Sequence, residues 1–326
     1  MSLIEVEHVS KEFKVYKRQK GVANNLKSLF VRSYETKNAV NDISFSVKQG
    51  EMVGYIGANG AGKSTTIKML SGILLPSSGR ICVDGIVPYE DRKKNAHNIG
   101  VVFGQRSQLN WDLPMEDTFE LYKRMYRVDD ASYRRNVDMF VNLMQMQDFL
   151  RKPVRQLSLG QKMRAELAIS LLHDPKLLYL DEPTIGLDVL VKDKIRKFIK
   201  TLNAEKKVTV ILTTHDMNDI DQICDRIIMI DRGKILSDDS LQMFKESHRE
   251  SYLVRIEYEE IFQEPHMDGI ALKSDKDGVR EYVVEKRSNS VNEILRCFGE
   301  AFRIKDISIK ENDIEEIVRR LYEALP

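Results

Sequence analysis

The sequence predicts an α/β fold with a mainly parallel sheet, because short apolar runs rich in β-branched residues alternate with helical stretches. This alternation is the pattern of buried parallel strands joined by crossover helices. The runs are MVGYI (52–56), NIGVVF (98–103), KLLYL (176–180), VTVILTT (208–214) and RIIMI (226–230). A helix is expected over 187–202, where apolar residues recur at spacings of three and four.

Two segments depart from this alternation. The strand signal is absent from about 113 to 172, where amphipathic helices are expected over 116–126 and 132–146. We therefore expect a helical subdomain of about 113–172 inserted between two strands.

The chain after residue 236 has a different pattern. Tyr252, Val254, Ile256 and Tyr258 alternate as one face of a strand, and helical apolar stripes follow at 291–298 and 314–325. We therefore expect a first domain over 1–236 and a small α+β domain over 237–326. Packing or self-association, rather than chemistry, is the expected role of the small domain.

Composition narrows the class of protein. The 51 basic and 50 acidic residues leave a net charge of +1, which gives no electrostatic reason to expect a nucleic-acid binder. Cys82, Cys224 and Cys297 lack metal-type spacing, and we expect them to be reduced and buried in a cytosolic protein. No apolar run approaches the roughly 20 residues that a membrane helix needs, and the start lacks the apolar core of a secretory signal. Any membrane association is therefore expected through a partner or an amphipathic surface.

The stretch GANGAGKS, from Gly57 to Ser64, matches the phosphate-loop pattern G-x-x-x-x-G-K-[ST] between a predicted strand and a helical segment. Glycines let backbone N–H groups turn toward a polyphosphate, and the helix that follows adds its positive end. We expect Lys63 to reach the β and γ phosphates and Ser64 to ligate magnesium. The expected nucleotide contacts are Gly57, Ala58, Asn59, Gly60, Ala61, Gly62, Lys63, Ser64 and Thr65.

Polar side chains follow three of the other predicted strands. Asp181 and Glu182 come directly after LLYL, and we expect Asp181 to hold magnesium through water and Glu182 to deprotonate the attacking water. His215 follows VTVILTT, at the sheet edge where α/β proteins bind ligands, and is expected to contact the γ-phosphate. Gln105 follows NIGVVFG and is placed to link the nucleotide with the helical subdomain.

The stretch LSLGQKMR (157–164) has two interpretations on residues alone. Ser158 and Gln161 have the spacing of a capping box, in which each side chain satisfies a backbone N–H at a helix start. A helix N-terminus is also a site for anions.

Together, these motifs resemble those of ATP-binding cassette (ABC) proteins, the nucleotide-hydrolysing subunits of membrane transporters. The phosphate loop, Gln105, LSLGQ, LLYLDE, Gly186-Leu187-Asp188 and His215 occur in the family's order and approximate spacing, over residues 1 to about 236. EPTIGLD and the small C-terminal domain are most similar to the branch associated with drug, antibiotic or polysaccharide export.

The resemblance implies a dimer, because this chain carries each motif once. Ser158, Gly160 and Gln161 of one cassette would contact the ATP held by the other, so the capping box and the anion site are compatible. It also implies a catalytic set of Glu182, His215, Lys63 and Gln105, with Gln105 also a magnesium ligand, a nucleotide contact at Asp188, and Phe13 stacked on the adenine. Tyr16 and Tyr34 remain alternatives for the adenine.

Three features differ from the family's usual pattern or are open. Leu159 replaces the first glycine of LSGGQ, which would be costly at a positive φ, and we expect an active site that tolerates it. A basic insertion over 14–38 carries Leu26, Leu29 and Phe30, and either touches the membrane or permease or packs on its own domain. Trp111 is expected either to contact the membrane subunit or to lie in the core.

The expected function is the ATP-hydrolysing subunit of an ABC exporter, on the cytoplasmic face of the cell membrane. With ATP and Mg²⁺ it would close as a homodimer or heterodimer and so drive a separate integral membrane permease, which chooses the cargo. No nucleic acid is expected. The alternatives are a soluble cassette ATPase acting on ribosomes or DNA, and a non-hydrolysing regulatory cassette.

Overall fold

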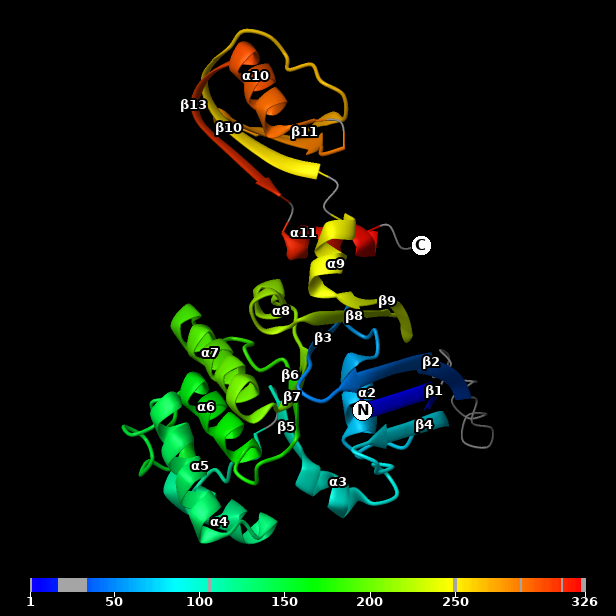
Figure 1. Ribbon diagram of the computed structural model, residues 1–326, viewed down its shortest axis with the longest axis vertical. Coiled ribbons are helices and arrows are strands. Elements are labelled where there is room, and N and C mark those ends of the chain that lie inside the picture. Colours follow the sequence, from blue (N-terminus) through cyan, green and yellow to red (C-terminus); the bar gives the residue numbers. More distant parts are fainter. Residues whose placement is uncertain are drawn as a thin grey trace, which may run out of the picture. The chain divides into compact units, whose positions relative to one another are not determined.

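The computed structural model describes residues 2–16, 34–104, 107–248, 251–287, 289–311 and 313–323 (Figure 1). The chain divides into two compact units, Met1–Ser240 and Leu241–Pro326. The division lies just after strand β9 (Lys234–Ser240), whereas the sequence-based boundary at 236 falls inside that strand.

The central sheet of the first unit is mainly parallel, as predicted. Among the described residues it has the strand order β5-β6-β7-β3-β8-β9. Neighbouring strands from β5 to β8 are parallel, and β9 alone pairs antiparallel, with β8. The parallel strands are β3 (Met52–Gly57), β5 (Ile99–Phe103), β6 (Leu177–Asp181), β7 (Thr209–Thr213) and β8 (Arg226–Asp231).

Helices lie on both sides of this sheet. Figure 1 shows α5, α6 and α7 on one side and α2 on the other. The helices that connect the core strands are α2 (Lys63–Leu70), α3 (Arg92–Asn98), α7 (Val189–Lys206) and α8 (Met217–Ile223). The helix predicted over 187–202 is α7, which begins after Asp188 and runs on to a left-handed cap at Lys207.

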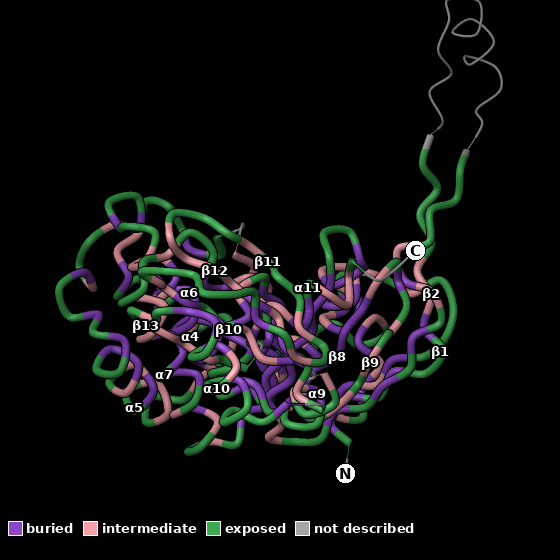
Figure 2. The backbone as a smooth tube through the Cα atoms, turned by 90° about the horizontal axis from the view of Figure 1, so that it is seen from above, coloured by how far each residue is buried: buried purple, intermediate pink, exposed green. Residues whose placement is uncertain are grey.

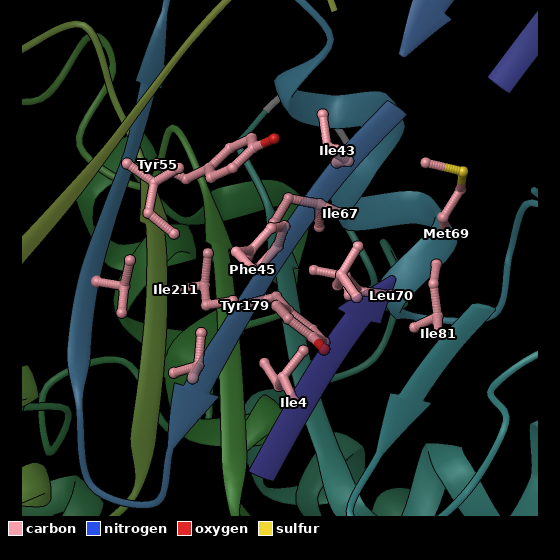
Figure 3. Close-up of a cluster of buried hydrophobic side chains, with 14 of the residues drawn as sticks. Ile4, Ile43, Phe45, Tyr55, Ile67, Met69, Leu70, Ile81, Tyr179 and Ile211 are labelled. Atoms are coloured by element: carbon pink, nitrogen blue, oxygen red, sulfur yellow. The ribbon is translucent and has the colours of Figure 1, made fainter. Parts of the chain in front are cut away.

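A second sheet, which we did not predict, covers the α2 side of the core. Its antiparallel strands have the order β2-β1-β4 and are β1 (Ser2–Tyr16), β2 (Tyr34–Lys48) and β4 (Ser78–Val83). The close-up in Figure 3 shows Ile4 and Phe45 of this sheet beside Tyr179 of the central sheet, with Leu70 of α2 in the same cluster. This buried cluster joins α2 to both sheets, so it fixes the helix that begins at the phosphate loop.

The predicted basic insertion is partly strand. The β1–β2 pairing continues as far as Tyr16 and Tyr34, so the described residues at both ends of 14–38 extend the hairpin. Figure 2 shows this end of the hairpin as exposed. Leu26, Leu29 and Phe30 lie outside the described residues, and the proposal of an amphipathic helix there stays a prediction.

The segment between β5 and β6 contains the helices α4 (Met115–Tyr126), α5 (Asp130–Leu143) and α6 (Leu159–Ser170), with a short 3₁₀ turn at Val154–Gln156. No strand of the described chain interrupts them. Each helix buries an apolar face, which includes Phe119 of α4, Phe140 of α5 and Leu167 of α6. The signature stretch therefore lies at the start of the last helix of this segment.

The second unit has the α+β composition that the sequence predicts. A four-stranded antiparallel sheet with the order β11-β12-β10-β13 packs on α10, through a core that includes Val254, Tyr282 and Phe298. The elements are α9 (Leu241–His248), β10 (Ser251–Ile261), β11 (Ile270–Lys276), β12 (Val279–Glu285), α10 (Val291–Ala301), β13 (Phe302–Glu311) and α11 (Ile314–Glu323).

The cysteine prediction was only partly right. All three thiols are free, but only Cys224 is buried, while Cys82 and Cys297 are partly exposed. Within the described part of the chain, no helix combines the length and the apolar character needed to cross a membrane.

Candidate active site

The phosphate loop leaves the carboxyl end of β3 at Gly57 and enters α2 at Lys63. Gly62 caps α2 with φ 117°, a conformation that favours glycine. A Cβ atom on Gly62 would lie 2.5 Å from the carbonyl oxygen of Ala39, and one on Gly57 would lie 2.5 Å from that of Ile230. Two of the motif's glycines are therefore required by contact with neighbouring strands.

Lys63 is buried within this loop, with only 6% of its surface exposed. Its Nζ donates to the carbonyl oxygens of Gly57 at 2.6 Å and Ala58 at 3.2 Å. Burial lowers the pKa of Lys63, while the carboxylates of Glu182 and Asp181 act in the opposite direction. No side chain caps α2 in the described structure, so its first turn also offers N–H groups to an anion.

Ser64 and Asp181 bring two oxygen ligands together. Ser64 Oγ donates to Asp181 Oδ1 at 3.2 Å, and Thr213 on the next strand donates to the same oxygen. Oxygen ligands suit Mg²⁺, which is usually held by one or two protein groups plus substrate phosphates and water. No group of three or more His, Cys, Asp or Glu side chains in the described residues could hold a metal alone. The residues therefore fit a magnesium ion that is completed by phosphate oxygens.

Glu182 and His215 are brought into contact at the same edge of the sheet. His215 Nε2 lies 2.9 Å from Glu182 Oε1. Glu182 has φ 57°, which is uncommon for a residue with a side chain, and its N–H donates to the carbonyl of Thr213 at 2.8 Å. Such conformations cost about 1–3 kcal/mol and tend to occur at functional sites.

Gly104, just after β5, lies at the same edge of the sheet and contacts the backbone at the end of β6. Its N–H donates to the Asp181 carbonyl at 2.8 Å, and a Cβ atom there would lie 2.3 Å from the Glu182 carbonyl oxygen. Gln105 itself lies outside the described residues, so its predicted roles stay predictions.

Sequence reasoning missed a buried ionic network that supports the loops carrying Glu182 and His215. Asp219 is fully buried and accepts hydrogen bonds from Thr184 and from Thr214, at 3.2 Å for Thr214. Arg196 of α7 pairs with Asp219 at 2.6 Å. The loops after β6 and after β7 are thus tied to one carboxylate. The available signal was an arginine within the apolar face of α7.

Two pockets adjoin the phosphate loop. One is lined by Ser64, Lys68, Ile73, Phe103, Gly104, Asp181 and Glu182. The other is lined by Phe13, Lys37, Ala39, Asn59, Gly60, Gly62, Lys63, Ser64, Thr65 and Glu182. Phe13 is 37% exposed, and Lys11 Nζ lies 5.2 Å from the centre of its ring. Phe13 is therefore on the wall of the phosphate-loop pocket, while the side chains of Tyr16 and Tyr34 are not described.

The signature stretch forms the predicted capping box at the start of α6. Ser158 Oγ accepts from the Gln161 N–H at 3.2 Å, and Gln161 Oε1 accepts from the Ser158 N–H at 2.9 Å. Leu159 has no positive φ, so the backbone strain considered above does not arise. Gly160 is tightly packed, because a Cβ atom there would lie 3.1 Å from a Val191 methyl carbon, which would have to shift slightly.

Five residues with predicted contacts line neither of the two pockets. Ser158, Gly160 and Gln161 line neither pocket beside the phosphate loop. Asp188 caps α7 by accepting from the Val191 N–H at 2.9 Å. Trp111 is 57% exposed, with Lys162 Nζ 4.4 Å from its ring centre, so the alternative of a core tryptophan was wrong.

Comparison with known proteins identifies the family. Residues 40–185 match the family described as ABC transporter. The ABC transporter ATP-binding protein NatA of Bacillus subtilis is 32% identical, over 65% of this chain and 85% of its own length. The bacitracin transport ATP-binding protein BcrA of Bacillus licheniformis is 28% identical, over 89% of this chain and 94% of its own length.

A solved structure agrees. The dimeric post-hydrolysis structure of an ATP-binding cassette bound to ADP and Pi has a TM-score of 0.61 and 26% identity, covering 73% of this chain and 98% of that one. These relatives and the arrangement of Lys63, Asp181, Glu182 and His215 show that the chain belongs to the ABC transporter family, as an ATP-binding subunit with ATPase activity.

Proposed function

We propose that this chain powers export through a separate integral membrane permease, by closing as a dimer on ATP and reopening after hydrolysis. The main support for the proposal is that the residues expected to bind ATP form two separate groups in one chain, which we call half-sites. The phosphate loop, Glu182 and His215 share one edge of the sheet, whereas Ser158, at the start of α6, lines neither pocket there. One chain thus supplies half of each site, and a second copy or a homologous subunit supplies the rest.

Each residue of the first half-site has a role that its environment supports. The N–H groups of the loop and Lys63 bind the phosphates of ATP, and Glu182 accepts a proton from the attacking water. His215 holds one oxygen of Glu182 and contacts the γ-phosphate. Ser64 and Asp181, with Gln105, would hold Mg²⁺, which neutralises charge on the phosphates when bound.

The second half-site is the N-terminus of α6. Ser158 and the N–H groups of Gly160 and Gln161 would contact the γ-phosphate bound by the partner subunit. Leu159, the first residue of α6, is 51% exposed. Asp188, at the start of α7, is assigned to the same interface, and Phe13 is assigned to the adenine.

We infer the membrane partner from one exposed aromatic residue and from the names of related proteins. Trp111 is a large exposed aromatic beside Lys162, the type of residue that anchors protein interfaces, and we assign it to contact with the permease. BcrA is named for bacitracin transport and LnrL of Bacillus subtilis for linearmycin resistance, which favours export of drugs or antibiotics. The chain would then lie on the cytoplasmic face of the membrane, with the unit after Ser240 serving self-association or packing.

The proposal is tested by purifying the Glu182→Gln protein with ATP and magnesium from detergent-solubilised membranes of its own cells. We expect a polytopic membrane protein in stoichiometric amount, and none when Lys63→Ala is added. Copurification of ribosomes or DNA without a membrane protein would favour the soluble alternative and contradict the transport role.

A further inference from the structure

Glu166 is a buried carboxylate on α6 to which none of the motifs assigns a role. It lies roughly two helical turns after Ser158 and is only 5% exposed. Its Oε1 accepts hydrogen bonds from Ser107 Oγ at 2.5 Å and from the Gln108 N–H at 2.8 Å. Its Oε2 is buried and has no partner among the described residues.

The segment that Glu166 holds is tied from two other directions. The Gln108 side chain donates to the carbonyl of Val101 on β5. The hydroxyl of Tyr122 on α4 donates to the Gln108 carbonyl at 3.0 Å. Gln108 is therefore bonded to the central sheet, to α4 and to α6 at once.

Strand β5, which the Gln108 side chain contacts, ends at the hydrolysis site. Gly104, just after β5, donates its N–H to the Asp181 carbonyl at 2.8 Å and packs against the backbone of Glu182. Glu166 thus anchors α6 to Ser107 and Gln108, and Gln108 ties that segment to β5, whose Phe103 pairs with Asp181 in the sheet.

A carboxylate is a costly choice at this position. Burial raises the pKa of Glu166, while the hydrogen bonds from Ser107 and Gln108 oppose that rise. An apolar side chain could fill the same space without that desolvation cost, but it could not accept two hydrogen bonds from the segment. The specific contribution of Glu166 is therefore the pair of hydrogen bonds that hold Ser107 and Gln108 against α6.

We propose that Glu166 is a positioning residue, which fixes the orientation of α6, and so of Ser158 and Gly160, relative to Asp181 and Glu182 of the same chain. This inference rests on the proposed function, in which the start of α6 acts on the partner's ATP. In each chain, Glu166 would then align the start of α6, which acts on the partner's ATP, with Asp181 and Glu182, which act on the chain's own ATP. Hydrolysis at the two sites would depend on one buried carboxylate per subunit.

The test measures steady-state ATP turnover of the full-length chain as kcat and KM, with nucleotide binding and thermal unfolding measured for every variant. For Glu166→Ala we expect kcat to fall at least about tenfold, because small misplacements of a reacting site are costly. KM should stay within about twofold, because the phosphate loop is untouched. Glu166→Gln should recover most of the turnover, since its amide oxygen can accept both hydrogen bonds.

Two further variants locate the effect. Ser107→Ala should lower kcat in the same direction, and the double variant with Glu166→Ala should be little worse than Glu166→Ala, because Glu166→Ala already removes the Ser107 contact. Ser170→Ala is the matched control. Ser170 is 6% exposed on the same helix, and its hydroxyl donates to the Leu167 carbonyl within that helix, so its loss should leave kcat unchanged.

Wild-type turnover in Glu166→Ala would overturn the inference, as would an equal loss in Glu166→Gln and Glu166→Ala when both still bind ATP. Failure of the proposed composite site gives a different result. In that case Ser158→Ala also turns over normally, whereas a failed inference alone leaves Ser158→Ala defective and Glu166→Ala active.

Discussion

His215 and Glu182 are joined by a 2.9 Å contact between Nε2 and Oε1, at the carboxyl ends of the neighbouring strands β7 and β6. The strand register places Asp181 opposite Thr213, and the Glu182 N–H bonds to the Thr213 carbonyl at 2.8 Å. The sheet therefore sets the backbone positions from which both side chains reach each other. A carboxylate has two oxygens, so the contact leaves Glu182 a second one to accept a proton.

Glu182→Gln should remove turnover while leaving ATP bound. An amide cannot accept the proton of the attacking water, and loss of a general base typically costs about 10²–10⁴-fold in rate. Phosphate release and equilibrium nucleotide binding measure the two effects separately. Glu90→Gln, an exposed glutamate outside both pockets, is the control and should behave as wild type. Normal hydrolysis by Glu182→Gln would show that the base is another group.

His215→Ala should slow hydrolysis more than His215→Gln. The alanine variant leaves Glu182 without its 2.9 Å contact, whereas a glutamine amide can still donate to the carboxylate. We expect a fall in kcat of at least about tenfold for alanine and a smaller one for glutamine. Equal rates for the two variants would mean that the contact does not orient the base.

Lys63→Ala should weaken ATP binding by at least about tenfold, because hydrogen bonds to a charged group contribute about 1.5–3 kcal/mol. Isothermal titration with ATP measures the loss. Thermal unfolding is measured alongside, since Lys63 also bonds the carbonyls of Gly57 and Ala58. Lys200→Ala, on the exposed face of α7, is the control. ATP affinity unchanged in a folded Lys63→Ala protein would contradict the assignment of the loop.

Leu159→Gly should change ATP turnover by less than about twofold, because Leu159 has no positive φ that glycine would relieve. Gly160→Leu should lose turnover, since even a Cβ atom there would lie 3.1 Å from Val191. Comparing the two kcat values tests which signature glycine position matters. Much faster turnover in Leu159→Gly would show that this leucine restrains the enzyme.

His173 should make the folded state sensitive to acid. Its ring stacks on Tyr126 with centroids 4.0 Å apart, Nε2 lies 3.1 Å from the Ile99 carbonyl oxygen, and burial lowers its pKa to about 4. Between that value and about 6.5 the unfolded chain binds a proton that the folded chain does not. The free energy of unfolding should therefore fall by about 2 kcal/mol through this residue from pH 7 to pH 5.

Urea unfolding at both pH values checks this, with His173→Phe keeping the stack and losing that part of the pH dependence. His8→Ala is the control, because the His8 side chain is 82% exposed. The same pH dependence in wild type and His173→Phe would contradict the prediction.

The sequence predicted the strands that are buried along their whole length and the motifs whose residues are contiguous in the chain. The strands β3 and β7 are wholly buried and read as unbroken apolar runs, so the parallel sheet was predictable. The antiparallel sheet buries one face only, and β1 has several register shifts that disturb its pattern. The alternation of Ile43, Phe45 and Val47 in β2 was nevertheless a readable signal of a half-buried strand.

A single sequence could not predict contacts between residues that lie far apart in the chain. Glu166 with Ser107 and Arg196 with Asp219 are ordinary charged or polar residues in their own segments, and only folding brings them together. The burial expected for Cys82 failed for the same reason, because exposure is decided by tertiary packing. The phosphate loop, in contrast, is contiguous, and its spacing alone specifies its chemistry.

In the proposed dimer, the start of α6 in one chain contacts the ATP held by the other chain. Analytical ultracentrifugation of full-length Glu182→Gln, with and without saturating ATP, tests this contact. The comparison is the same protein carrying Ser158→Arg, which places a bulky side chain at that helix start. We expect an ATP-dependent dimer for Glu182→Gln and a monomer for the double variant. A Glu182→Gln protein that binds ATP and stays monomeric, or a double variant that dimerises equally well, would contradict it.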